Sequence, residues 1–285
     1  MKTTRYFSGH LFRHDLRSNL LLTIVILLIM LMMANVINVA MSIMETDMAE
    51  TAVPAVGLPG AMAGFPGGMD MTFLLNRMYF TVIGLLPLFL LIVLLANGLV
   101  AGQVDNGSMA YILSTPTKRS AVTLTHIVYL VLLPLVVIGI VMAMRLASNT
   151  VLRGDPNAAE TAALYAGMYV LAEALAGVCF LGSCLFDRSR HSLAFGGGIA
   201  VWCFLASLLG MFGTDKLVNI GVGVEQLGIF NRLTLIGLYD IESLSTVGSG
   251  AVDTAFVWKL LVLAAVAVVC YTAGAVRFSR KDLPL

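Results

Sequence analysis

Glu173 is the residue of this 285-residue sequence whose surroundings most suggest chemistry. It lies in the middle of an apolar segment, where a carboxylate is costly to bury and by default indicates a functional site. Asn35 and Asn38, in another apolar segment, are polar groups that could act with it. A structural role for Glu173, with the carboxyl protonated or hydrogen-bonded to a neighbouring helix, is the alternative.

The other reactive residue types form no recognisable site. The four cysteines lie in apolar segments without the spacing of a metal site, and we interpret them as small core residues. His10 and His14 are four residues apart, but no third ligand lies near them in the sequence. Because no Gly-x-x-x-x-Gly-Lys-Ser/Thr, Gly-x-Ser-x-Gly or His-Glu-x-x-His motif occurs, the sequence predicts no metal or cofactor site in this chain and no enzyme.

The composition indicates an integral membrane protein. Hydrophobic residues make up 59% of the chain and charged residues 12%, against about 25% charged residues in soluble domains. The net charge of +1 and the lack of an aromatic-basic cluster argue against a nucleic-acid partner, so lipid is the expected surrounding. The first apolar run is far longer than that of a cleavable signal peptide.

Six apolar segments predict an all-α protein with a single transmembrane domain over residues 1–285. Each is near or above the ~20 residues that cross ~30 Å of hydrocarbon. They are residues 20–44, 78–101, 121–144, 161–186, 193–212 and 257–278. The segment 213–256 alternates short apolar and polar pieces, which predicts interfacial or re-entrant helices before the last span.

Residues 2–18 predict an amphipathic helix on the membrane surface. Phe and Leu fall on one half of the helix and basic residues on the other, a pattern that suits an anionic lipid interface. Arg5 and Asp15 are exceptions, because they fall on the apolar half. The alternative is a basic segment that only sets the topology.

The distribution of basic residues places both termini on the cytoplasmic side of a cell membrane, which we expect to be bacterial. Eleven of the 17 basic residues then face the cytoplasm. They are Lys2, Arg5, Arg13, Arg17, Lys118, Arg119, Arg188, Arg190, Arg277, Arg280 and Lys281.

Small residues and prolines predict how the spans pack. The fourth span is rich in Ala and Gly, so we expect it to pack closely against other helices. The Gly196–Gly198 run of the fifth span predicts the same. Pro87 and Pro134 lie inside the second and third spans, where proline often kinks a helix.

Residues 103–119, between the second and third spans, predict a helical elbow. Asp105, Asn106 and Gly107 are a turn signal, because Asn and Gly accept a positive φ. Ser108 can cap a short helix over 109–114, which must end before Pro116, where a new helix restarts. The short helix presents an apolar edge of Met109, Ile112 and Leu113, with Lys118 and Arg119 just beyond.

This elbow resembles that of the permease subunits of ATP-binding-cassette exporters, the ABC type 2 permease family. The family segment typically reads Glu-x-x-x-Gly-Thr-Leu-x-x-Leu-Leu-Ser-x-Pro-x-Ser-Arg. The positions here that are identical or similar are Gly107, Ser108, Met109, Ile112, Leu113, Ser114, Pro116 and Arg119. Asp105 stands closer to the glycine than the family's acidic residue, and Lys118 replaces its Ser. The ending Phe278-Ser279-Arg280-Lys281-Asp282-Leu283 is similar to the family's Phe-x-Arg-Arg-Asp-Leu.

The resemblance implies a non-catalytic membrane subunit of an exporter. The elbow would be a coupling helix that docks on a separate cytoplasmic ATPase, which binds ATP and Mg, and a second permease copy or a paralogue would complete the transporter. The coupling residues it implies are Asp105, Gly107, Ser108, Met109, Ile112, Leu113, Pro116, Lys118 and Arg119.

Two other functions use Glu173 instead. In an ion-coupled secondary transporter it would bind the coupling proton, although no convincing inverted repeat relates residues 20–144 to residues 161–278. In a membrane-embedded enzyme it would act with Asn35 or Asn38. For residues 103–119 the alternative is a loop that only connects two spans.

Overall fold

The chain is described by a computed structural model over residues 8–50, 71–109, 119–154, 158–213, 224–247 and 254–280. These residues are almost entirely helical and include no strand. The helices are α1 (Gly9–Glu50), α2 (Met71–Met78), the π helix η1 (Tyr79–Ile83), α3 (Leu85–Leu99), α4 (Ala101–Asp105), α6 (Arg119–Arg153), α7 (Ala158–Leu185), α8 (Ser189–Met211), η2 (Glu225–Leu227), α10 (Gly228–Arg232), η3 (Ile236–Leu238), α11 (Ile241–Ser245) and α12 (Ala255–Arg280).

Six membrane-length helices confirm the predicted number of spans. Within the described residues, six helical stretches are long and apolar enough to cross a membrane, and they indicate a multi-pass membrane protein. They are Gly9–Ile43, Leu75–Leu99, Arg119–Leu152, Ala158–Leu185, Ser189–Gly210 and Ala255–Arg280. Each overlaps one predicted segment, and the first and third are longer than predicted.

A separate N-terminal surface helix is not observed. Residues 2–7 lie outside the described part, and from Gly9 the chain forms α1 without interruption to Glu50. On a helical projection of the sequence, Asp15 falls on the apolar half as an exception. In the structure, Asp15 is buried against the rest of the bundle. The apolar half of residues 9–18 therefore packs partly on protein, and a surface position of residues 2–18 stays a prediction.

The second span contains a π-helical turn. The Gly84 N–H donates to the Tyr79 carbonyl at 2.8 Å, an i to i+5 bond that closes η1 before α3 begins. Pro87 is the third residue of α3, in a first turn where a missing N–H costs least. The predicted distortion thus lies just before Pro87, whereas α6 runs through Pro134 as one helix.

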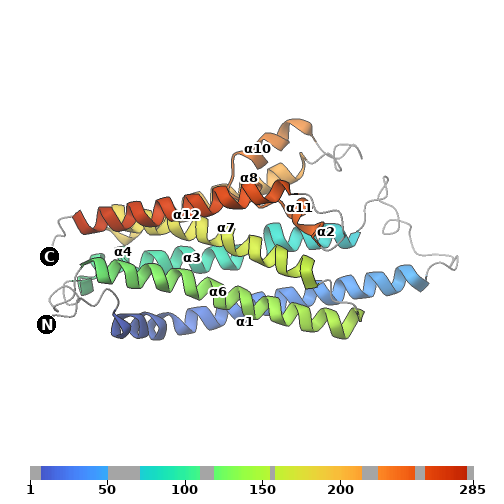
Figure 1. Ribbon diagram of the computed structural model, residues 1–285, viewed down its shortest axis with the longest axis horizontal. Coiled ribbons are helices and arrows are strands. Elements are labelled where there is room, and N and C mark those ends of the chain that lie inside the picture. Colours follow the sequence, from blue (N-terminus) through green and yellow to red (C-terminus); the bar gives the residue numbers. More distant parts are fainter. Residues whose placement is uncertain are drawn as a thin grey trace.

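Helix α7 is the centre of the bundle, as its small residues predict. It packs mainly along α12 and also contacts α3, α6 and α8, while α1 packs along α6 (Figure 1). A Cβ added at Gly177 would lie 3.0 Å from the Ala267 carbonyl oxygen, so the missing side chain lets α12 approach. A Cβ at Gly196 would lie 3.0 Å from Cys179 Sγ, but one at Gly198 would meet nothing within 4 Å.

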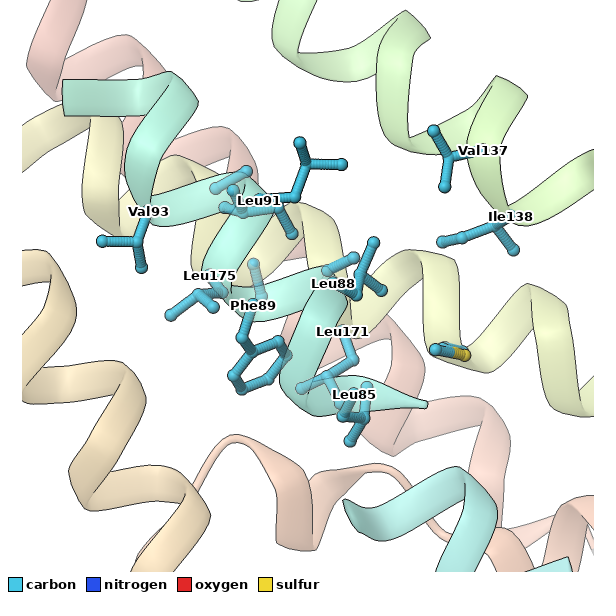
Figure 2. Packing of buried hydrophobic residues seen from close by; sticks show 14 of the residues in the cluster. Leu85, Leu88, Phe89, Leu91, Val93, Val137, Ile138, Leu171 and Leu175 are labelled. Atoms are coloured by element: carbon cyan, nitrogen blue, oxygen red, sulfur yellow. The ribbon is translucent and has the colours of Figure 1, made fainter. Parts of the chain in front are cut away.

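The buried hydrophobic cluster extends from α1 to α12, and one part of it lies where α3 faces α6 and α7. Leu85, Leu88 and Leu91 of α3 gather there with side chains of the other two helices, as Figure 2 shows. Leu171 and Leu175 of α7 reach it from one side, and Val137 and Ile138 come from α6. Since lipid tails are as apolar as these side chains, close packing rather than water exclusion holds the spans together.

The two ends of the bundle differ in what they carry (Figure 1). The elbow end holds the start of α1, α4 and the end of α12. The distal end holds α2, α11 and the end of α6. The short helices η2, α10, η3 and α11 lie between α8 and α12, where short helical pieces were predicted. Asp240 caps α11, because its side chain accepts from the Ser243 N–H at 3.2 Å.

Candidate functional site

The elbow begins with the predicted turn. The backbone departs from α geometry at Val100, forms α4, and turns at Asn106 and Gly107. Gly107 has a φ of +71°, the left-handed conformation that favours glycine. The Ser108 hydroxyl donates to the Gln103 carbonyl at 3.2 Å, so it reaches back to α4. The predicted short helix, apart from Met109, lies outside the described residues, as do Ile112, Leu113, Pro116 and Lys118.

Met109 is not on an exposed edge. Its side chain is 1% exposed and belongs to the hydrophobic core of the chain itself. The sequence predicted an apolar docking edge here, because an apolar side chain in a polar elbow has no other evident partner. In the structure the partner is the bundle, so Met109 is not available to a second protein. Arg119 is the first residue of α6.

Hydrogen bonds join the elbow and the residues just before it to the end of α7 and the start of α8. Asp105 is exposed, and its Oδ2 accepts from the Ser189 N–H at the start of α8, at 3.4 Å. Asn97 Nδ2 donates to the Ser189 hydroxyl at 2.7 Å. The Ala101 N–H donates to the Ser183 hydroxyl at 2.9 Å. A displacement of α4 would therefore be transmitted to α7 and α8.

A cavity of about 530 Å³, lined by both polar and apolar residues, separates the elbow from the start of α1. One wall belongs to α1 and includes His14, Asp15 and Asn19. The other wall belongs to the end of α3 and the elbow and includes Gln103 and Asn106. The elbow is thus packed on α7 and α8 but open toward α1.

A buried carboxylate–imidazole pair lies beside this cavity. Asp15 Oδ2 is 3.0 Å from His126 Nδ1, and the two side chains are only 2% and 1% exposed. His126 Nε2 is buried and has no hydrogen-bond partner. The Ser8 N–H donates to the Thr125 hydroxyl at 3.1 Å, next to this pair. Helices α1 and α6 are therefore joined by polar contacts at the elbow end.

Glu173 is buried between α7 and α12. Its Oε2 accepts from the Tyr271 hydroxyl at 3.0 Å, while Oε1 is buried without a partner. Asn35 donates to the Leu31 carbonyl of its own helix, and Asn38 to the Arg145 carbonyl, so each is engaged elsewhere. The structure thus shows Glu173 as a contact between two spans and does not join it with the asparagines proposed to act with it.

Arg145 is a buried cation that the sequence analysis did not single out. It lies on α6 near the distal end, and it is 5% exposed. Its Nη2 donates to Asn76 Oδ1 at 2.7 Å and lies 4.0 Å from Met41 Sδ. The guanidinium carbon lies 4.9 Å from the ring centre of Tyr79 and 5.3 Å from that of Phe80. Together these contacts form an aromatic and amide cage around the charge.

The cage is joined to α7 by a pair of tyrosines. The hydroxyls of Tyr79 and Tyr165 are 3.0 Å apart, and the Phe80 and Tyr165 rings meet edge to face with centres 5.1 Å apart. Tyr79 and Phe80 belong to η1, so the π-helical turn brings them both toward Arg145. Such turns are frequent at functional sites.

Two ion pairs lie close to the cage at the distal end. Arg77 pairs with Glu242, and Lys259 Nζ lies 2.6 Å from Asp240 Oδ2. Burial raises the pKa of Asp240, but the hydrogen bonds from Lys259 and Ser243 outweigh it and hold the pKa below the ordinary value of 3.8. All four charged side chains line a cavity of about 140 Å³, whose wall also includes Thr81.

The predicted topology contained a sign that Arg145 could be a buried cation. With both termini inside, Arg145 is one of the six basic residues left outside, and it follows directly on the predicted third span. A cation at that position belongs either to a loop or to a longer helix that buries it. Helix α6 continues to Arg153, and the second case holds.

The described residues contain no cluster of three or more His, Cys, Asp or Glu side chains that could hold a metal. Their cysteines are free thiols. Comparisons with models of protein families, with curated proteins and with solved structures give no match for this chain.

Proposed function

We propose that the chain is the permease subunit of an ATP-driven exporter, with the elbow as the dock for a separate cytoplasmic ATPase. The observation that carries the proposal is the described part of the elbow: the short helix α4 and the turn at Asn106 and Gly107, between two membrane-length helices, at the end of the bundle that holds both the start of α1 and the end of α12. The distribution of basic residues assigns this end to the cytoplasm.

The contacts of the elbow suit a coupling role. ATP-driven movement must reach the spans as a rigid-body displacement, so the docked element has to be fastened to them. Asp105 and Asn97 bond to Ser189 at the start of α8, and Ala101 bonds to Ser183 near the end of α7. Asn106, Gly107 and Ser108 are exposed, so they stay accessible to a partner from outside the bundle.

Glu173 gives the alternative functions less support. A proton-coupled transporter or a membrane enzyme needs its carboxylate to reach an ion or a substrate. Glu173 is 8% exposed, accepts from Tyr271, and lines neither the cavity beside the elbow nor the cavity at the distal end. A contact that holds α7 to α12 accounts for its position.

The test is affinity purification of the tagged chain from its native membrane, followed by mass spectrometry. We expect a soluble protein with a phosphate-binding loop to co-purify. Asn106→Arg places a bulky charge on the exposed elbow without disturbing the core, and it should abolish the recovery of that protein. Met109→Asp is unsuitable, because it would put a charge in the core.

His191→Arg is the matched control, because His191 is exposed on α8 at the same end of the bundle. It should leave recovery of the ATPase unchanged. A chain that transports its substrate without any co-purifying ATPase would refute the proposal. Equal loss of the ATPase in both variants would refute the elbow as the dock.

A further inference from the structure

Arg145 carries a positive charge that nothing in the described structure neutralises. No carboxylate among the described residues lies within 4 Å of it, and its Nη1 is buried without a hydrogen-bond partner. Cation–π contacts with Tyr79 and Phe80 offset part of the cost of burial, but they leave the net charge unchanged. Buried charges in proteins are normally paired, so an unpaired guanidinium suggests a missing anion.

The neighbouring cations at the distal end are paired with carboxylates, as buried charges usually are. Arg77 is paired with Glu242, and Lys259 with Asp240, although both cations are less buried than Arg145. Their carboxylates come from the segment between α8 and α12. Arg145 instead faces only neutral groups, which are the rings of η1, the amide of Asn76, the Met41 thioether and the Tyr165 hydroxyl.

The cage offers further groups that an anion could use. Asn38 on α1 and Asn149, one helical turn after Arg145 on α6, are both buried. Asn38 lies against the Arg145 carbonyl, with Nδ2 at 3.5 Å from it, and its Oδ1 has no partner. A planar guanidinium with amides beside it suits a carboxylate or phosphate, which accepts several N–H donors at once.

The surroundings also fit an apolar body attached to the anion. Val39 and Met144, the chain neighbours of Asn38 and Arg145, are exposed apolar side chains on membrane-length helices. A molecule with its head group at Arg145 could lie along this outer face of α1 and α6.

The charged cavity at the distal end adjoins η1, the helical turn that contributes the rings of the cage. The cavity of about 140 Å³ is lined by Thr81, the residue after Phe80, and by Tyr239. Arg145 itself is 5% exposed, so access requires a shift of the cage. The π-helical turn at η1 lies between the cavity and Arg145, and it is the element whose local rearrangement would open the way.

We propose that Arg145 and its cage are a binding site for the anionic head group of an amphiphile, a carboxylate or phosphate on an apolar body. The anion would pair with the free Nη1 side of the guanidinium, and the rings of η1 would cover the charge. Only the further step, that such an amphiphile is the exported cargo, rests on the proposed function.

The test uses the full chain, purified without any ATPase, in nanodiscs of zwitterionic lipid. The probes are laurate and, as its uncharged counterpart, dodecanol. We expect laurate to raise the thermal midpoint of unfolding in a saturable manner and dodecanol to leave it unchanged. Discs containing phosphatidylglycerol, measured without laurate, distinguish a membrane lipid from a free anion as the source of the head group.

Three variants locate the effect. Arg145→Met should weaken laurate binding at least about tenfold, and Arg145→Lys should weaken it less, because it keeps the charge but loses the planar fork. Arg190→Met removes an exposed cation at the elbow end and should leave laurate binding unchanged. Laurate binding by Arg145→Met within about twofold of the wild type would overturn the proposal.

A photoreactive fatty acid locates the site even if Arg145→Met does not fold. After irradiation of the wild-type chain, we expect labelled peptides from residues 76–81 and 138–149. Labels confined to other segments, or equal effects of laurate and dodecanol, overturn the proposal. Because no ATPase is present, a chain that binds laurate through Arg145 but recruits no ATPase would overturn only the exporter assignment.

Discussion

The Asp15–His126 pair allows a quantitative test of how α1 is held to α6. Asp15→Ala would leave both ring nitrogens of His126 without a partner, because Nε2 already has none. A buried polar group left unpaired costs about 1–3 kcal/mol, and more where the group is charged. Since His126 is 1% exposed, we expect a loss of about 3 kcal/mol from the free energy of unfolding.

The assay is a double-mutant cycle. Asp15→Ala, His126→Ala and the double variant are unfolded reversibly in mixed micelles and followed by far-ultraviolet circular dichroism. Each single variant should lose about 3 kcal/mol, whereas the double variant should lose about 2 kcal/mol less than the sum, because it strands neither partner. His14→Ala, an exposed neighbour on α1, should change stability by no more than about 0.5 kcal/mol.

Additive losses would refute this account. If the double variant equals the sum of the single variants within about 0.5 kcal/mol, the two side chains do not interact in the folded protein.

Three further predictions concern the other contacts. Gly177→Ala should destabilise the chain by about 1–3 kcal/mol, because α12 must move away from α7. Gly198→Ala should be neutral, because a Cβ there meets nothing within 4 Å. Reversible unfolding in mixed micelles compares the stability of the two variants. Tyr271→Phe should lower the free energy of unfolding by about 1–3 kcal/mol, because the Glu173 carboxyl loses its hydrogen-bond donor. Glu173→Gln should lower it less, because an amide oxygen still accepts from Tyr271. A larger loss of stability for Glu173→Gln than for Tyr271→Phe would contradict a structural role of Glu173. The pKa of Asp240 is lowered on folding, so its contribution to stability is complete above the pKa of the unfolded state and is lost as the pH falls through the pKa of the folded state. Asp240→Asn should remove this part of the acid dependence, which the thermal midpoint of unfolding measures from pH 6 down to pH 3.

The spans were predictable because membrane helices satisfy a simple requirement. An apolar segment of sufficient length has to be helical in lipid, where every backbone N–H and carbonyl needs a partner within the segment. The Ala and Gly content of the fourth span likewise predicted its close packing against other helices, since small residues allow the approach seen at Gly177. Both inferences depend on residues close together in the sequence.

The polar contacts were less predictable because they join distant segments. Asp15 and His126 are 111 positions apart, and nothing near either one identifies the other as its partner. Met109 belonged to a pattern that fitted a dock, yet its burial depends on how the elbow folds back on the bundle. Arg145 was missed because the end of an apolar segment does not fix the end of a helix.

The length of α1 has a mechanical consequence. Its 42 residues make a rod of about 63 Å at 1.5 Å per residue, roughly twice the hydrocarbon thickness. A rod of that length amplifies rotation, so that a tilt of about 5° about one end displaces the other end by about 5 Å. One end of this lever borders the elbow cavity through His14 and Asp15, and its more distant turns carry Asn38 and Met41 to the Arg145 cage. A small change at one surface of the bundle can therefore become a displacement of several ångströms at the opposite surface, with no change in the fold of the helix between them.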